Sequence, residues 1–426
     1  MGDHKIGYKD IFKQKEYMKT VIADIINRFG DSIDSIAFTW LVYQVTQSAA
    51  WSAIIFGVNR IPTIFLQPFA GAAIEGKNKK HIMVATDIIR GISVGFVATA
   101  LIMGFLNQWI LLAGTVVISC AEAFRRPAST AMLPKLLDKK YYEFGLSLST
   151  SACSITELIG LGVAGIIIAV SSVSIAIYID MATFFVSGFI ILSLKVKEEK
   201  LTKGKINAKE YIDSLKGGFS YLKEKAVLRY FVLLAVFLNG VLVPLNSLQA
   251  PLVREVLGAG EIMLSVLQIS ITLGMIIGAT VYPYISRKLS RHAIASLGGY
   301  SIAVYYFTFV FAGNYVDSVL ILYIIISVVS FAVGIAVSLF SSLCSVEFVK
   351  NIESAYMARV SAIFGATCVA AIPVVSLIVS ALAGVVSTIV LFFVAGVLDV
   401  IICISLCNKK RFRTMKEDKM EGLLDG

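Results

Sequence analysis

The chain has 426 residues, of which 57% are hydrophobic and only 15% are charged, and its mean hydropathy is +0.82. These values lie outside the usual range for soluble globular proteins and predict a polytopic membrane protein. The formal net charge of +10 then reflects basic loops beside an anionic inner leaflet, so nucleic-acid binding is not expected.

Apolar segments of about 20 or more residues, each long enough to cross a bilayer as a helix, recur along the chain. Twelve such spans cover residues 17–46, 51–74, 82–105, 109–132, 143–170, 175–195, 228–250, 261–286, 293–313, 319–345, 355–383 and 385–407. Polar residues precede the first span, so we expect no cleavable signal peptide. Alternate gaps contain almost no Lys or Arg, which predicts cytoplasmic N- and C-termini in the cell membrane.

A long polar segment separates the sixth span from the seventh, with nine lysines from Lys195 to Lys225. The predicted fold is an all-α membrane protein with two pseudo-symmetric six-helix bundles, residues 1–195 and 228–426, joined by a cytoplasmic linker at 196–227. Within the linker, apolar residues at helical spacing between 208 and 222 predict an interfacial helix. Two related six-helix halves around a central site are a known architecture of secondary transporters.

The first span contains four charges and an amide, at Asp24, Asn27, Arg28, Asp31 and Asp34. In a helix these side chains share one face about 120° wide. Because a charge at the bilayer centre costs roughly 3 to 15 kcal/mol, that face must border a bundle interior or a wet cavity. Arg28 could simply pair with Asp24 and Asp31 inside the helix. Asp34 has no such partner, so we interpret Asp31 and Asp34 as functional.

Two further spans contain carboxylates at membrane depth. In the fourth span, Glu122 and Arg126 lie on a polar stripe with Thr115 and Ser119, either as part of a transport path or as a structural ion pair. In the fifth span, Glu157 lies on a polar side, and the glycines that follow it would let a neighbouring helix approach closely.

The seventh span contains the amides Asn239, Asn246 and Gln249 around Pro244. Proline removes a backbone donor and should kink this helix. The amides are candidate substrate contacts, and ordinary core packing is the alternative.

The three histidines lie in predicted cytoplasmic segments, so proton coupling within the membrane would depend on carboxylates. The candidate proton carriers are Asp31, Asp34, Glu122 and Glu157. We interpret Asp180 and Asp399 as structural, with Asp180 capping the outward end of its helix. The sequence contains no phosphate-binding loop, catalytic elbow or metal-ligand spacing, so neither an enzyme, a cofactor nor a metal is predicted.

Several short motifs resemble the major facilitator superfamily. They are Asn27-Arg-Phe-Gly-Asp, Arg60-Ile-Pro, Gly71-x-x-x-Glu75-x-x-x-Lys79-Lys80 and Asp87-x-x-Arg90. Downstream, the sequences that start at Arg126, Gly160, Ile179 and Ala358 are similar to the macrolide-efflux and enterobactin-exporter branch. The chain departs from the pattern at Glu75 and Gly76, where Asp and Arg are usual, and at Leu161, where the antiporter motif has Pro.

The resemblance implies a cavity lined by spans 1, 4, 7 and 10, and an inner gate. The gate residues it implies are Glu75, Lys79, Lys80, Asp87 and Arg90, with Arg359 as a partner. For Lys79 and Lys80, simple solvation in a loop is the alternative interpretation.

We therefore expect a secondary transporter that exports amphipathic or hydrophobic small molecules by alternating access, with protons as coupling ion and the bilayer as its surroundings. A monomer is expected. The alternatives are a lipid or lysophospholipid translocator, a siderophore-like metabolite transporter, and a receptor that transports nothing. A receptor would need a filled interior with every charge paired.

Overall fold

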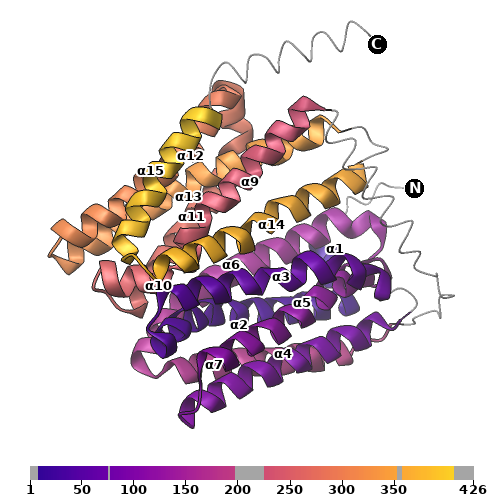
Figure 1. Ribbon diagram of the computed structural model, residues 1–426. Coiled ribbons are helices and arrows are strands. Elements are labelled where there is room, and N and C mark those ends of the chain that lie inside the picture. Colours follow the sequence, from indigo (N-terminus) through magenta and orange to yellow (C-terminus); the bar gives the residue numbers. More distant parts are fainter. Residues whose placement is uncertain (1–7, 75–76, 197–224, 353–356, 407–426) are drawn as a thin grey trace, which may run out of the picture. The chain divides into compact units, whose positions relative to one another are not determined.

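The computed structural model describes residues 8–74, 77–196, 225–352 and 357–406, and within these ranges every regular element is a helix (Figure 1). Glu75, Gly76 and the predicted interfacial helix at 208–222 lie outside the described residues. Arg359 belongs to a helix, but its side chain is not described.

The first half of the chain forms one long helix for each predicted span. After the short helix α1 (Tyr8–Phe12) come α2 (Lys15–Thr46), α3 (Ala49–Ala73), α4 (Lys79–Ile102), α5 (Gln108–Leu136), the 3₁₀ turn η1 (Lys139–Tyr141), α6 (Tyr142–Val170) and α7 (Val173–Leu192). Side-chain caps begin three of these helices: Asn78 accepts from the backbone of α4, Asn107 from α5 and Ser172 from α7.

The second half repeats this arrangement. Its elements are α9 (Ala226–Ser247), α10 (Gln249–Pro251), the π-helical turn η2 (Leu252–Val256), α11 (Glu261–Lys288), α12 (Arg291–Tyr315), α13 (Val319–Lys350), α14 (Met357–Ala383) and α15 (Thr388–Leu406). The helix expected to kink at Pro244 ends three residues later, and a π turn follows where the regular backbone pattern is broken.

Nine helices in the described part of the chain are long and apolar enough to cross a membrane. The nine do not include α2 or α5, which contain the charged residues predicted above, or α14, in which only Thr367–Ala383 is described as a shorter apolar helix. Every predicted span therefore has its helix, and the crossing of the bilayer by all twelve stays a prediction.

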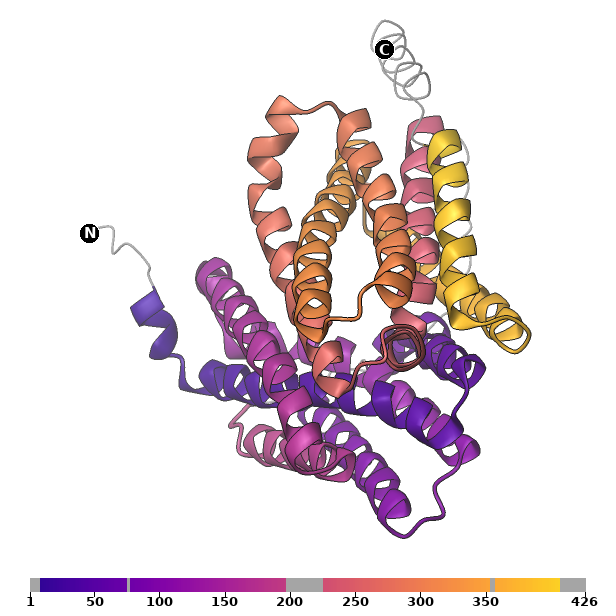
Figure 2. The ribbon, with the colours of Figure 1, turned by 90° about the vertical axis from the view of Figure 1, so that its left-hand side faces the viewer.

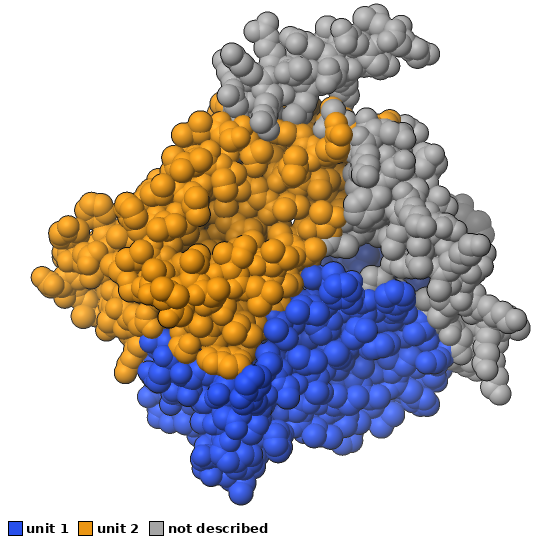
Figure 3. Space-filling view, viewed as in Figure 1, with its two compact units in different colours: residues 1–47, 58–206 blue, residues 48–57, 207–426 orange. Residues whose placement is uncertain are grey.

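The chain divides into two compact units, residues 1–47 with 58–206 and residues 48–57 with 207–426 (Figure 3). Four pairings of long helices recur in the two units, whereas the extensive packing of α11 against α13 has no equivalent between α3 and α5 in the described residues. In unit 1, α2 packs against α6 and α7, and α4 against α5 and α7; in unit 2, α9 packs against α14 and α15, and α12 against α13 and α15. The same pairing in both units agrees with a duplicated six-helix plan. The bundle of unit 2 is seen most clearly in Figure 2.

Glycines set the closest helix contacts in both units. A Cβ on Gly160 of α6 would lie 2.7 Å from Ser32 Cβ and 3.0 Å from the Phe29 carbonyl oxygen of α2. In unit 2, a Cβ on Gly274 of α11 would overlap the Phe331 carbonyl oxygen of α13. Small residues at such crossings let two backbones meet, as in other membrane helix pairs.

Candidate functional site

Polar side chains from four helices meet in the interior of unit 1. Asp24, Asn27, Asp31 and Asp34 lie at intervals of three or four residues along α2, so one face of that helix carries all four. This face meets side chains from α4, α5 and α7, and the contacts fall into two groups.

The first group is centred on Asp87 of α4, which is fully buried. Arg125 Nε of α5 donates to Asp87 Oδ1 at 2.6 Å, and Ser187 Oγ of α7 donates to Asp87 Oδ2 at 2.9 Å. Asn27 Nδ2 in turn donates to Ser187 Oγ at 2.9 Å. Arg125 also lies 3.5 Å from Asp24 Oδ1, so one guanidinium serves two carboxylates.

The second group is centred on Arg90 of α4, one turn further along the same helix. Its Nη2 donates to Asp31 Oδ1 at 2.8 Å, and its guanidinium lies 4.1 Å from the ring centre of Phe184. An ion pair with a cation–π contact is a stable arrangement for a guanidinium removed from water. Arg90 Nε remains buried without a hydrogen-bond partner among the described residues.

Asp34 and Asp180 lie next to this second group. Within the described ranges, Asp34 Oδ1 is buried without a hydrogen-bond partner. Asp180 is only 1% exposed, and its Oδ1 lies where α7 meets Gly30, inside the space that a Cβ on that glycine would need. The interpretation of Asp180 as a cap is wrong, because Asp180 lies inside α7 and Ser172 caps that helix.

The intrahelical pairing considered for Arg28 is wrong for both carboxylates. Asp24 pairs with Arg125 of α5 and Asp31 with Arg90 of α4, so tertiary partners replace the neighbours in sequence. Arg28 itself is exposed. Arginines on other helices are the favoured partners because they reach the buried side of α2, where the carboxylates need neutralising charges.

The predicted pair on α5 is present. Arg126 Nη2 lies 2.8 Å from Glu122 Oε1, with the Arg126 side chain 62% exposed, and Ser119 of the same stripe accepts a hydrogen bond from Asn59 of α3 at 3.0 Å. Glu157 on α6 is half-buried. These carboxylates therefore lie at the edges of the unit 1 interior described here.

The three amides of the seventh span have different surroundings. Asn239 donates to the Ala235 carbonyl of its own helix at 2.9 Å, Asn246 is exposed, and Gln249 is buried and bonded to Gln268 of α11 at 2.8 Å. Of the three, Asn246 alone presents its amide to the outside of unit 2.

The residues predicted to form an inner gate are only partly described. Asp87 and Arg90 are bound inside unit 1 as given above. Lys80 Nζ donates to the Leu194 carbonyl at 2.8 Å and Lys79 is buried, so solvation in a loop is the wrong interpretation for both.

Sequence reasoning missed Arg125, Asp180 and Ser187 as members of this cluster. It passes over Arg125 because the neighbouring Arg126 fits the polar stripe of α5. One residue changes direction by about 100° in a helix, which turns Arg125 toward α2 and α4 instead. One signal in the sequence could have identified Arg125. An arginine inside a predicted span needs a carboxylate partner, and Asp87 lies in the neighbouring predicted span.

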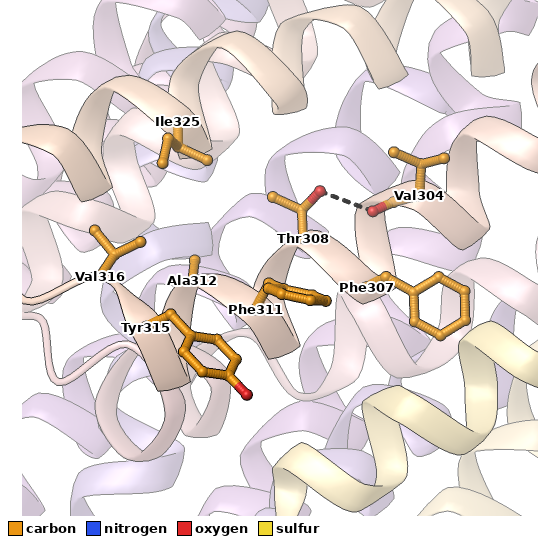
Figure 4. Close-up of a pocket in the computed structure, with 8 residues that line it drawn as sticks. All are labelled: Val304, Phe307, Thr308, Phe311, Ala312, Tyr315, Val316 and Ile325. Carbon is orange, nitrogen blue, oxygen red and sulfur yellow. Dashed lines mark hydrogen bonds between the residues drawn. The ribbon is translucent and has the colours of Figure 1, made fainter.

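Unit 2 contains a pocket of different character. It has a volume of about 400 Å³ and is lined by Val304, Phe307, Thr308, Phe311, Ala312, Tyr315, Val316 and Ile325 (Figure 4). The hydroxyl of Thr308 donates to the Val304 carbonyl at 2.8 Å, so it is satisfied within α12. The pocket is thus an apolar one, without the charges of unit 1.

Two compact helical units, a buried charge cluster and, in the described ranges, nine helices long and apolar enough to cross a membrane are typical of a polytopic membrane transporter. The chain belongs to the Major Facilitator Superfamily, whose family model matches residues 20–376. Membership of this family indicates a transport activity and not enzymatic chemistry.

Individual relatives are distant. The chain is 24% identical to the uncharacterized MFS-type transporter YvqJ of Bacillus subtilis over 59% of this chain and 60% of that protein, and 29% identical to the putative bacilysin exporter BacE of the same species over 62% and 65%. It is 22% identical to macrolide efflux protein A of Streptococcus pyogenes over 84% and 86%. The crystal structure of the nucleoside transporter NupG matches 92% of this chain and 98% of its own, with a TM-score of 0.72 and 11% identity, which shows the fold alone.

Proposed function

We propose that this transporter exports amphipathic or hydrophobic small molecules across the cell membrane in exchange for protons. Two relatives named for export, of macrolides and of bacilysin, support efflux over uptake. In this proposal a monomer with twelve spans and cytoplasmic termini works by alternating access. The gate predicted from sequence, including Glu75 and Arg359, is part of the same proposal.

The observation that carries proton coupling is a charge imbalance inside unit 1. Among the described residues, five carboxyl groups, from Asp24, Asp31, Asp34, Asp87 and Asp180, share the interior with the two buried guanidinium groups of Arg90 and Arg125, while the exposed Arg28 also acts on Asp24. An uncompensated buried charge is strongly destabilising. The carboxyl groups that exceed the two arginines therefore require protons or a cationic substrate.

The other candidate residues take supporting roles in this proposal. Asp31 and Asp34, with Glu122 and Glu157, take up and release protons, while Arg28 and Arg126 attract anionic groups or stabilise those carboxylates. Asn27, Asn239, Asn246 and Gln249 contribute hydrogen bonds to substrate or to neighbouring helices. Hydrophobic walls then select substrates loosely, as expected for multidrug efflux.

Reconstitution in liposomes with an imposed pH gradient tests this function. A fluorescent cationic dye and a macrolide serve as substrates, and we expect transport that collapses when a protonophore removes the gradient. Asp34→Asn should abolish gradient-driven transport at an unchanged protein level. Equal transport with and without the gradient would overturn proton coupling. Movement of a labelled lysophospholipid, but of neither drug, would overturn the substrate class and support lipid translocation.

A further inference from the structure

Asp34 and Asp180 form a pair of carboxyl groups between two helices. Asp180 of α7 lies against Gly30 of α2, and Asp34 follows one turn further along α2. α2 and α7 pack closely against one another, and Asp34 lies on the same face of α2 as Gly30. The absence of a side chain at Gly30 is what allows the Asp180 carboxyl to reach α2.

The charged groups around this pair come from each neighbouring helix. α2 contributes Asp31, which acts on both carboxyls, and α4 contributes Arg90. On α5, Arg125 pairs with Asp87 and Asp24, and Glu122 pairs with Arg126. α7 contributes the Thr183 hydroxyl, 3.4 Å from Asp180 Oδ1.

From α6, the side that packs on α2 presents Gly160 to Ser32, and its Glu157 acts on Cys153 of its own helix. Among the described residues, Arg90 is thus the cation that acts on the pair, and Asp31 already occupies it with a hydrogen bond of 2.8 Å. Asp31 and Arg90 neutralise one another, and this part of the structure leaves Asp34 and Asp180 without a cation of their own.

In a low-dielectric interior the ionisation of one carboxyl disfavours the ionisation of its neighbour, so the pair binds a proton more strongly than either carboxyl would alone. We propose that Asp34 and Asp180 share one exchangeable proton, with Asp34 as the group that exchanges it with water and Asp180 as the positioning residue whose carboxylate strengthens its binding. The proton comes from solvent, forms one O–H bond on a carboxyl of the pair and leaves as the same proton, so no other reactant takes part.

Exposure assigns these roles. Asp34 is partly exposed although its Oδ1 is buried, whereas Asp180 is only 1% exposed. Asp34 Oδ1 has no hydrogen-bond partner among the described residues, and a proton shared with Asp180 would give it one. This inference rests on the proposed proton coupling. It adds a partner for Asp34, namely Asp180 of α7, which the sequence had suggested was structural.

The test is the pH profile of dye transport in proteoliposomes by wild type, Asp180→Asn and Asp34→Asn. Removal of the Asp180 carboxylate weakens proton binding at Asp34, so half-maximal transport by Asp180→Asn should shift about one pH unit or more toward acid. Thr183→Val, which removes a donor to the Asp180 carboxylate, should give a smaller shift toward alkaline pH.

Asp399→Asn is the matched control, because Asp399 is also a fully buried aspartate on the last helix of its unit, and its profile should match wild type. A lower maximal rate without a shift in Asp180→Asn would overturn the shared proton and leave Asp180 a packing role. Thr183→Val decides the matter if Asp180→Asn does not fold, since an unshifted profile there would also contradict the pair. Wild-type transport that ignores the gradient would instead overturn the proposed function.

Discussion

The two units share several helix pairings but differ in their interiors. Unit 1 places charged residues between α2, α4, α5 and α7. At the corresponding helices, unit 2 places aromatic rings: Phe392 of α15 packs edge-on against Tyr306 and Phe309 of α12, with ring centres 5.4 and 6.0 Å apart. The hydroxyls of two buried tyrosines there are satisfied, since Tyr305 bonds Ser330 at 2.7 Å and Tyr306 donates to the Val241 carbonyl at 2.6 Å.

The aromatic interior and the charged interior affect the stability of a bundle differently. Aromatic packing stabilises a bundle without any desolvation of charge. A buried ion cluster is at best neutral for stability, so its presence in unit 1 indicates a function that needs charge inside the membrane. Among the described residues, unit 1 therefore gathers an ionic cluster from four helices, whereas unit 2 combines aromatic packing with the ion pair of Arg291 and the buried Glu347, 3.1 Å apart.

The largest effect is expected at Arg125, which neutralises Asp87 and Asp24. Arg125→Ala leaves a fully buried Asp87 carboxylate without its cation, and breaking a buried pair in this way costs about 3–5 kcal/mol. Thermal unfolding in detergent should show the loss. Arg126→Ala, next in sequence but 62% exposed, should cost under about 1 kcal/mol. Equal losses for both variants would contradict the ionic interior of unit 1.

The tight crossing of α11 and α13 should be the corresponding weak point of unit 2. Gly274→Ala forces a methyl group into the Phe331 carbonyl, and overpacking of this kind costs about 1–3 kcal/mol. Gly365→Ala in α14 meets nothing within 4 Å and should be neutral or slightly stabilising. Melting temperatures of the two variants measure the difference, and a stable Gly274→Ala protein would show that the contact can relax.

Asp399 is a buried aspartate of unit 2 and can be compared directly with Asp87 of unit 1. Within the described part of the chain it has no ion pair, and Cys403 Sγ lies 3.5 Å from its Oδ1. A lone buried carboxyl is expected to be neutral, so Asp399→Asn should change stability by less than about 1 kcal/mol. The matching variant Asp87→Asn should cost more, because it leaves Arg125 underpaired. Unfolding of both proteins under the same conditions checks this, and the reverse order would contradict it.

The smallest effect is expected at Glu16, outside the predicted first span. The Lys195 backbone N–H donates to Glu16 Oε2 at 2.8 Å and Lys19 lies 2.9 Å from Oε1, and these contacts hold the pKa of Glu16 below its ordinary value. A lowered folded-state pKa means that the contribution is present at neutral pH and is lost as pH falls through that pKa. Glu16→Gln should therefore melt slightly earlier than wild type at pH 7, and the gap should close below roughly pH 4. A gap that persists in acid would mean that charge is not its cause.

Much of the site could be anticipated from sequence. The face of α2 with Asp24, Asp31 and Asp34 follows from helical spacing, and so does the Glu122–Arg126 pair, because neighbours at i+4 meet in any helix. Whether Arg28 or a distant arginine neutralises Asp24 could not be predicted this way. That choice depends on which helices pack together, and the periodicity of a single helix carries no information about this packing.

By itself, the sequence determined the class of protein, the number and limits of the long helices and the polar face of α2, because hydrophobic length and 3.6-residue periodicity are local properties. Only the tertiary structure decided which charges meet. It paired Arg90 with Asp31 and Arg125 with Asp87, and it brought Asp180 of α7 against Gly30 of α2. The physical reason is that a charge buried in a membrane protein is neutralised by whatever group its helix packing brings within a few ångströms, however far away that group lies in the chain.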